Sequence, residues 1–237
     1  MEDRLDGGVV IRRVFAIYVD QAPVLMPAAA VVFVFSGVLS TVLLAAGSGL
    51  AVFALLISLV ATTLFTGMVV ELVSDIQDGR RDSSPGQLLS AVTPVLGRLI
   101  LVGIVAGAGV LVGFVLLVVP GLILITVWSV AAPVVVLERP PGLGALRRSR
   151  ELVRGSGWPV FGVIILLDVA VAIVAGGAEL GAESAGTGVG IVVRVVLGVL
   201  TAPLSALAAS VLYFDLRAIS SPAPSVAPVE SDPFGAG

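Results

Sequence analysis

The stretch LILVGIVAGAGVLVGFVLLVVPGLILITVWSVAAPVVVL, from Leu99 to Leu137, runs for 39 residues without a charge. A helix needs about 20 apolar residues to cross a hydrocarbon core of roughly 30 Å, so this run is too long for one span and suits two. Pro120 and Gly121 lie near its middle, in VVPGL. Because proline removes a backbone donor and glycine loosens a helix, we predict the break between the two spans there.

The rest of the chain is also strongly apolar. Of its 237 residues 58% are hydrophobic, and the mean hydropathy is +1.16, which indicates an integral membrane protein. The first apolar run exceeds the 7 to 15 residues of a cleaved signal peptide, so we expect it to be a retained helix. We therefore predict an all-α fold with six transmembrane helices, at about 24–46, 50–73, 99–118, 121–137, 158–177 and 188–213.

The two ends of the chain differ from this apolar middle. We expect residues 1–8 to be a flexible N-terminus and residues 9–218 to form the membrane domain. Residues 219–237 are rich in proline and small side chains, with too little apolar bulk to pack, so we predict a disordered tail.

Arginine supplies every one of the 13 basic residues, and its distribution predicts an orientation. Twelve arginines precede the first span, follow the last, or lie in alternate connections, which places them all on one side of the membrane. Cytoplasmic connections are enriched in basic residues, so both termini are expected to be cytoplasmic (N-in/C-in).

Three segments on that side have amphipathic helical spacing. In the segment 143–155 an apolar arc shares the helix with an arginine-rich face, and the segments 9–21 and 85–97 have the same character. We predict interfacial helices that meet anionic head groups through Arg147, Arg148, Arg150, Arg154, Arg12 and Arg13. Each segment precedes a pair of spans, and the three units are explained either by duplication or by the physics that all amphipathic helices share. The apolar arc of 143–155 comprises Ala145, Leu146, Ser149, Leu152 and Val153.

Missing residue types exclude several chemistries. The chain has no cysteine and no histidine, so it builds no disulfide, no thiolate nucleophile, no Ser-His-Asp triad and no ordinary zinc, copper or haem site. We predict no metal and no cofactor. The basic patches are small and lack interleaved stacking aromatics, so nucleic acid is not an expected partner.

One carboxylate and one arginine lie within predicted spans. Asp168 is about 15 Å from one boundary and Arg194 about 10 Å from the other, at 1.5 Å per residue, so they reach similar depths. They are predicted to form either a structural ion pair between the last two spans or a proton or ion relay.

Glu71, Asp75 and Asp78 recur at helical spacing and are predicted to form an acidic strip. A solvated face, a docking strip for the arginine helix, and a divalent-cation site are the three interpretations. Helix-packing pairs of small residues are also predicted, at Gly103 with Gly107 and at Gly109 with Gly113.

The order of motifs resembles a known family. The PG turn at Pro120, the boundary residue Glu138, ALRRSRELVRG at 145–155 and YFDLR at 213–217 are its most specific parts. In these the chain is similar to the six-helix bacterial family named after the membrane domain of glycerophosphoryl diester phosphodiesterases, over about residues 7–218. That resemblance implies the fold and a location in the plasma (inner) membrane of a bacterium, but the family's biochemical activity is generally undefined. The phosphodiesterase name comes from a separate soluble catalytic domain that these residues do not contain, so no such activity is carried over.

Three functions are weighed on these grounds. The preferred one is a non-enzymatic membrane protein that organises lipid or partner proteins, including a membrane protein partner, at the cytoplasmic face. The alternative is a transporter of a small solute, ion or lipid that uses Asp168 and Arg194. A metal-dependent enzyme acting on lipid head groups is the third.

Overall fold

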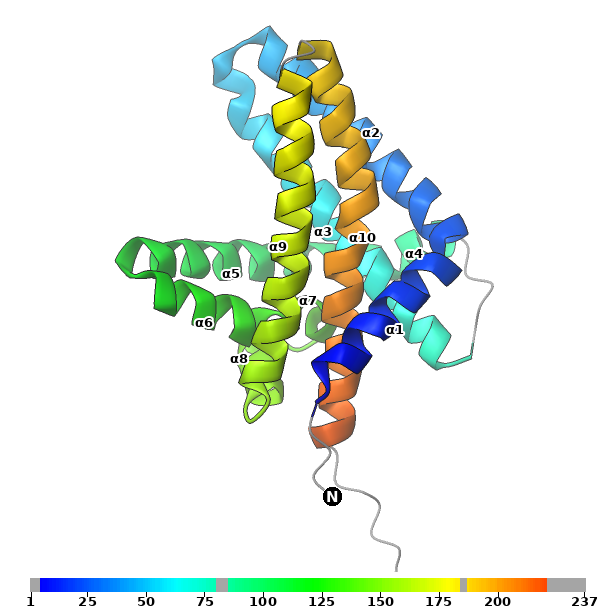
Figure 1. The fold of residues 1–237 in the computed structure, drawn as a ribbon, viewed down its shortest axis with the longest axis vertical. Coiled ribbons are helices and arrows are strands. Elements are labelled where there is room, and N and C mark those ends of the chain that lie inside the picture. Colours follow the sequence, from blue (N-terminus) through cyan, green and yellow to red (C-terminus); the bar gives the residue numbers. More distant parts are fainter. Residues whose placement is uncertain (1–4, 80–84, 184–186, 221–237) are drawn as a thin grey trace, which may run out of the picture.

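The computed structural model describes residues 5–79, 85–183 and 187–220, and within these ranges the protein is all-α with no strand (Figure 1). Six of its helical segments are long and apolar enough to cross a membrane, as the sequence predicts. They are α2 (Ala22–Ala46), α3 (Ala51–Gln77), α5 (Leu96–Leu116), the segment that begins with α6 (Val118–Trp128), α9 (Gly157–Glu183) and α10 (Thr187–Ser220).

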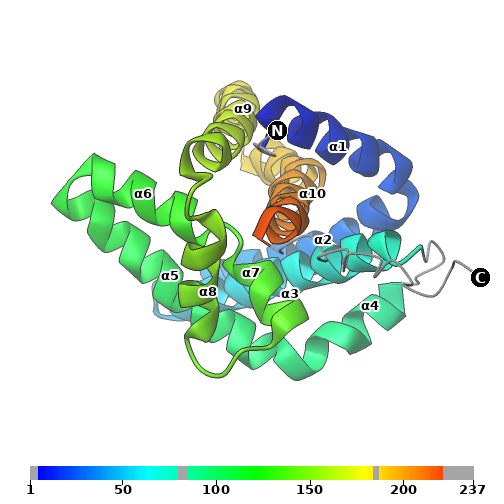
Figure 2. The ribbon, with the colours of Figure 1, turned by 90° about the horizontal axis from the view of Figure 1, so that it is seen from below.

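The spans pack as three antiparallel hairpins, α2 with α3, α5 with α6 and α9 with α10. Helix α10 also contacts α2 and α3, and it lies at the centre when the molecule is seen from below (Figure 2). The α5–α6 hairpin points sideways, away from the other two hairpins, in both views (Figures 1 and 2). The core therefore lies around α10 near the base of the molecule, where all three hairpins converge.

Three short helices surround this core: α1 (Gly7–Asp20), α4 (Pro85–Val92) and α8 (Gly144–Val153). Helix α1 packs on α9 and α10, α4 packs on α3, and α8 packs on α6 and α10. The predicted apolar arc of α8 is the set that the structure buries. Helix α8 buries this arc against α6 and α10, while its position at a membrane interface stays a prediction. An amphipathic pattern specifies an apolar neighbour without distinguishing a bilayer from another helix.

The break between the third and fourth spans differs from the prediction. The chain is extended at Leu117 (φ −166°, ψ 148°), so α5 ends at Leu116 and α6 begins at Val118. Pro120 lies in the first turn of α6, where a missing N–H breaks no helical hydrogen bond. The fourth span then continues beyond Trp128 through α7 (Ala131–Pro133) and a π-helical turn (Val134–Glu138).

Other boundaries also move. The predicted helix over 85–97 is interrupted after Val92 by a 3₁₀ turn that contains Pro94, from Thr93 to Val95. Helix α1 begins at Gly7, inside the segment expected to be flexible, because the Asp6 carboxylate accepts hydrogen bonds from the Gly8 and Val9 N–H groups. Helix α10 continues through Ser220, into the predicted tail, and residues 221–237 lie outside the described ranges.

Only one of the two predicted glycine pairs on α5 makes close contacts. A Cβ on Gly113 would lie 3.0 Å from the Gly121 backbone of α6, and one on Gly109 would lie 2.6 Å from the Trp128 ring. Positions 103 and 107 have open space around them. The close approach of α5 and α6 thus depends on Gly109 and Gly113.

Replacing Gly113 by leucine is expected to lower the free energy of unfolding by about 1–3 kcal/mol, because the new side chain overlaps the α6 backbone. Gly107→Leu is the matched control, since it makes the same chemical change at an open position of the same helix. Thermal unfolding of both variants in detergent measures the difference. Equal melting temperatures would contradict the packing described here.

Candidate functional site

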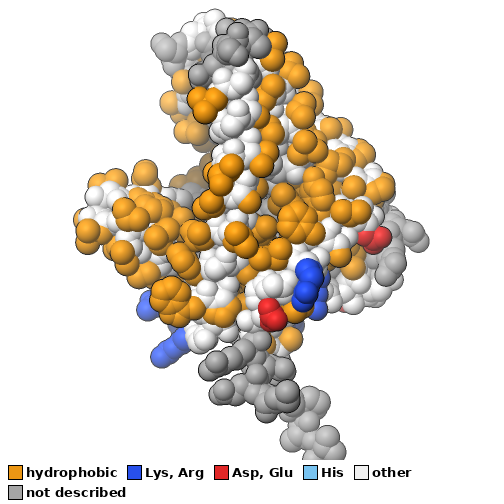
Figure 3. Space-filling model, in the orientation of Figure 1, with side chains coloured by type: hydrophobic (Ala, Val, Ile, Leu, Met, Phe, Trp, Pro, Cys, Tyr) orange, Lys and Arg blue, Asp and Glu red, His pale blue; other side chains and the backbone are white. Residues whose placement is uncertain are grey.

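Charged side chains gather at one end of the molecule. In Figure 3 the basic and acidic groups lie along the lower half, near α1 and α8, while the described surface above them shows hydrophobic side chains between uncharged ones. The exposed large apolar residues include Phe35, Leu55, Leu111 and Ile173, one on each of four spans. We call the charged end, with α1 and α8, the basic pole. A surface divided in this way matches a bilayer core bounded by a polar interface.

Within the basic pole, Glu138 is the centre of a hydrogen-bond network. Arg148 Nε donates to both carboxylate oxygens, at 3.0 and 3.3 Å, and the Tyr213 hydroxyl donates to Oε1 at 3.0 Å. Tyr213 is fully buried and also accepts a hydrogen bond from Arg217 at 3.4 Å. One carboxylate thus joins the π-helical turn, α8 and α10.

The local backbone explains why Glu138 points into this network. Val134, Val135 and Val136 are all buried, which fixes the π-helical turn against the core. Arg139 then adopts a left-handed conformation (φ 51°) that ends the helix, and Arg98 donates to its carbonyl at 3.0 Å. A left-handed arginine is uncommon and costs free energy, so the surrounding contacts must hold it.

A serine in the apolar arc positions α8 itself. Ser149 is fully buried, and its hydroxyl donates to the Val127 carbonyl in the last turn of α6 at 2.8 Å. Carbonyls in the last turn of a helix lack an intrahelical donor, so this hydrogen bond satisfies both groups. Helix α8 is therefore held to α6 by Ser149 and to the Glu138 network by Arg148.

Helix α1 is attached to α10 by two polar contacts. The Tyr18 hydroxyl donates to the Leu200 carbonyl at 2.9 Å, and burial raises the pKa of Tyr18 above its ordinary value. Arg13 forms an ion pair with Asp215. The apolar contacts of Val10 and Val14, both buried, complete this attachment.

The six arginines predicted to contact lipid divide into two groups. Arg148 is held by Glu138 and Arg13 by Asp215, and the exposed Arg147 forms an ion pair with Glu151 at 3.0 Å. Within residues 5–79, 85–183 and 187–220, the other three make no ion pair and extend from exposed positions. These are Arg12, Arg150 and Arg154.

The predicted intramembrane pair is only half described. Asp168 is exposed on α9, and the Ser205 hydroxyl of α10 donates to its Oδ1 at 3.4 Å. Arg194 belongs to α10, but its side chain lies outside the described part of the structure. The ion pair and the relay both stay predictions.

The acidic strip lies at the end of α3. Glu71 is half-buried and interacts electrostatically with Arg139, while Asp75 and Asp78 each have a polar partner of their own. Asp78 caps the helix instead of continuing it. In the described ranges no three acidic side chains converge as metal ligands, and the role of the strip stays a prediction.

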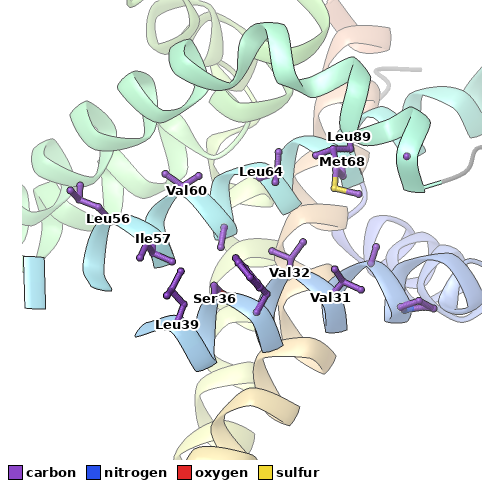
Figure 4. Close-up of a pocket in the computed structure, with 15 residues that line it drawn as sticks. Val31, Val32, Ser36, Leu39, Leu56, Ile57, Val60, Leu64, Met68 and Leu89 are labelled. Carbon is purple, nitrogen blue, oxygen red and sulfur yellow. The ribbon is translucent and has the colours of Figure 1, made fainter. Parts of the chain in front are cut away.

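Two hollows open on the surface of the spans. The first, of about 680 Å³, lies between α2 and α3 and reaches α4. Figure 4 shows Val32 and Leu39 of α2 facing Ile57 and Leu64 of α3 across it. Ser36 is the one polar side chain in its lining, and its hydroxyl already donates to the Phe33 carbonyl at 3.4 Å. This hollow therefore offers apolar surface without a group that selects a ligand.

The second hollow, of about 1190 Å³, is enclosed by α6, α8 and the start of α9. Its lining combines apolar side chains of α6 with the arginines of α8 that face away from the core. We call it the α6–α8 cleft. It differs from the first hollow because charge and apolar surface meet in it.

Sequence reasoning did not find the Glu138 network. The motifs of the resemblance contain Glu138, Arg148 and Tyr213, yet their spacing gives no sign that they meet. A tyrosine amid apolar residues near the end of a span was the available signal, because a buried hydroxyl requires a partner.

The spans, the hydrophobic surface and the basic pole define a polytopic helical membrane protein. The chain belongs to the family described as Domain of unknown function (DUF8558), whose model matches residues 87–216 and so includes the whole Glu138–Arg148–Tyr213 network. It is also similar to a UPF0259 membrane protein of the bacterium Pectobacterium carotovorum, at 32% identity over 99 residues. That similarity covers 42% of this chain and 39% of the relative, and no solved structure matches. The comparisons thus indicate a bacterial membrane protein family.

Arg148→Gln is expected to lower the free energy of unfolding by about 1–3 kcal/mol, because it leaves a half-buried carboxylate without its charged partner. Arg147→Gln, on the same helix, is expected to cost only about 0.3–0.5 kcal/mol, since its partner Glu151 is exposed. Thermal unfolding in detergent compares the two. A double-mutant cycle with Tyr213→Phe is expected to show coupling for Arg148 and none for Arg147, and the reverse pattern would refute the network.

Proposed function

We propose that this protein is a non-enzymatic membrane protein of the bacterial inner membrane that organises anionic lipid, or partner proteins, at the cytoplasmic face. The basic pole is the working surface. We also propose that the protein is related to the membrane domain named after glycerophosphoryl diester phosphodiesterases. That relation brings no phosphodiesterase activity with it.

The observation that carries the proposal is the division of the arginines. Arg148 and Arg13 satisfy carboxylates inside the fold. Arg12 on α1, Arg150 on α8 and Arg154, the residue that directly follows α8, extend from exposed positions instead. Basic residues near an anionic bilayer surface contribute about 1 kcal/mol each. An exposed guanidinium without a protein carboxylate is available to phosphate groups, which it binds through two parallel hydrogen bonds.

The apolar arcs support the same proposal in a second way. Helices α1 and α8 are fixed to the protein by buried contacts, so their arginines are held at defined positions. A helix that is attached only to the bilayer moves relative to the protein and enriches anionic lipid without a defined position. Arginines that are fixed to the protein enrich anionic lipid at defined positions. A fixed array of this kind suits a protein that organises its surroundings.

Replacing the three exposed arginines together by glutamine (Arg12, Arg150 and Arg154) is expected to abolish enrichment of phosphatidylglycerol over phosphatidylcholine around the protein. At about 1 kcal/mol for each arginine, the triple variant loses about 3 kcal/mol of the free energy of attraction to an anionic surface. Native mass spectrometry of protein released from mixed-lipid nanodiscs counts the lipids retained. The paired residue Arg147 supplies the control as Arg147→Gln, and enrichment that survives in the triple variant would overturn the proposal.

The orientation is tested by labelling, for which the cysteine-free chain is already suited. Ser90→Cys lies on α4 and Gly49→Cys at the turn between α2 and α3, on opposite sides of the proposed bilayer. In intact bacterial spheroplasts a membrane-impermeant maleimide is expected to label position 49 only, and position 90 only after lysis. Labelling of position 90 in intact cells would reverse the proposed topology.

The observation behind the alternative function is the exposed Asp168 on α9. A carboxylate within a span is costly and often marks an ion or proton pathway. Its described hydrogen bond is to Ser205, and the surrounding surface of α9 is apolar, with Val169 and Ile173 exposed beside it. Among the described residues, the polar contact of Asp168 is this one hydrogen bond to a neighbouring helix, which is the observation behind a structural role as the rival of transport.

A further inference from the structure

The α6–α8 cleft combines two kinds of surface at two levels. Val119 and Ile123 of α6 and Phe161 of α9 line its apolar part, while Arg150 and Arg154 line its mouth. From Val119 to Val127 the lining follows α6 over a rise of about 12 Å, at 1.5 Å per residue. In Figure 3 basic side chains lie at the lower left, directly below the hydrophobic surface of the α5–α6 hairpin.

Trp158 marks the level at which the two surfaces meet. It lies in the first turn of α9, it is 84% exposed, and its ring packs edge-to-face on Phe161 with the centroids 6.0 Å apart. Tryptophan prefers the boundary between head groups and hydrocarbon. The mouth of the cleft is therefore at head-group depth, and its apolar part continues into the hydrocarbon.

The mouth carries an excess of positive charge. Three arginines and Glu151 line it, which leaves a formal excess of two positive charges. Glu151 is already shared by Arg147 at 3.0 Å and Arg148 at 3.8 Å. Arg150 and Arg154, four residues apart, are thus the cations that the cleft offers to a ligand.

The cleft is also preformed. Ser149 fixes α8 to α6 through the Val127 carbonyl, and Gly155 adopts a left-handed conformation (φ 97°) that turns the chain sharply from α8 into α9. Its two walls are therefore held by contacts on the protein side. A preformed site loses less conformational entropy on binding than a mobile surface does.

We propose that the α6–α8 cleft binds one anionic phospholipid, with its phosphate at Arg150 and Arg154 and an acyl chain along α6. This inference rests on the proposed function and assigns it a particular site. Acyl contacts add little selectivity, because every competing lipid has the same chains. Discrimination comes from the head group, at about five-fold for each arginine, and so about 25-fold for the pair.

Trp158 provides an intrinsic probe. The chain has two tryptophans, so Trp128→Phe leaves Trp158 as the only tryptophan, and excitation at the red edge of its absorption avoids the tyrosines. In vesicles with brominated lipid, quenching reports which lipid occupies the cleft mouth. Brominated phosphatidylglycerol is expected to show an association constant about 25-fold above that of brominated phosphatidylcholine, falling about five-fold in Arg154→Gln. Arg12→Gln removes the same charge from α1, outside the cleft, and is expected to leave the constant unchanged.

The outcomes separate the cleft from the wider proposal. If Arg154→Gln and Arg12→Gln lower the association constant of brominated phosphatidylglycerol equally, lipid binding in the cleft is refuted, while general enrichment of anionic lipid still stands. No preference for phosphatidylglycerol in any variant would refute both. Native mass spectrometry of the chain with both tryptophans provides a second test. We expect one phosphatidylglycerol molecule to stay bound to the unmodified cleft and to be lost in Arg150→Gln/Arg154→Gln. The same retention in that variant would overturn lipid binding in the cleft.

Discussion

The structure depends on the carboxylate of Glu138. This group receives hydrogen bonds from Arg148 on α8 and from the fully buried Tyr213 on α10, and so it joins three parts of the chain at the point where the hairpins converge. Leaving a buried hydroxyl or a half-buried carboxylate without a partner costs about 1–3 kcal/mol, more than an exposed ion pair contributes. Together with the Ser149 hydrogen bond to α6 and the buried arc, this acceptor fixes the position of α8 and the direction in which its other arginines point.

Because α8 is fixed, its arginines have distinct roles although they are neighbours in sequence. Arg148 completes the fold, Arg147 balances Glu151, and Arg150 and Arg154 extend over the cleft beside α6. Helix α1 repeats this division, with Arg13 bound to Asp215 and Arg12 exposed. A basic helix in a membrane protein thus serves packing and surface charge together, and the position of a neighbouring carboxylate distinguishes the arginines that pack from those that stay on the surface.

Much of the fold could be predicted from the sequence because it follows from local rules. The lengths of the apolar runs predict six spans, and helical periodicity predicts the buried arc of α8. The break at Leu117 was misplaced because proline is as acceptable in the first turn of a helix as it is between helices. Periodicity could not say what covers the arc of α8, since lipid and protein impose the same pattern.

The candidate site was less accessible from sequence, because its contacts join distant residues. Glu138 and Tyr213 are 75 positions apart, and no periodicity links them. The arginines were found by their type, but their division into bound and exposed groups requires the position of each carboxylate. The α6–α8 cleft depends on how two helices diverge, which no local pattern encodes.

A protein that binds and arranges lipid, as we propose for this one, transports no solute and scrambles no lipid. The most direct test is solute flux and lipid scrambling by purified protein in liposomes that contain anionic lipid, with wild type compared to Asp168→Asn. The account predicts no flux and no scrambling above protein-free liposomes for either protein. Flux in the wild type that is lost in Asp168→Asn would contradict it, and would identify the aspartate of α9 as part of a transport path.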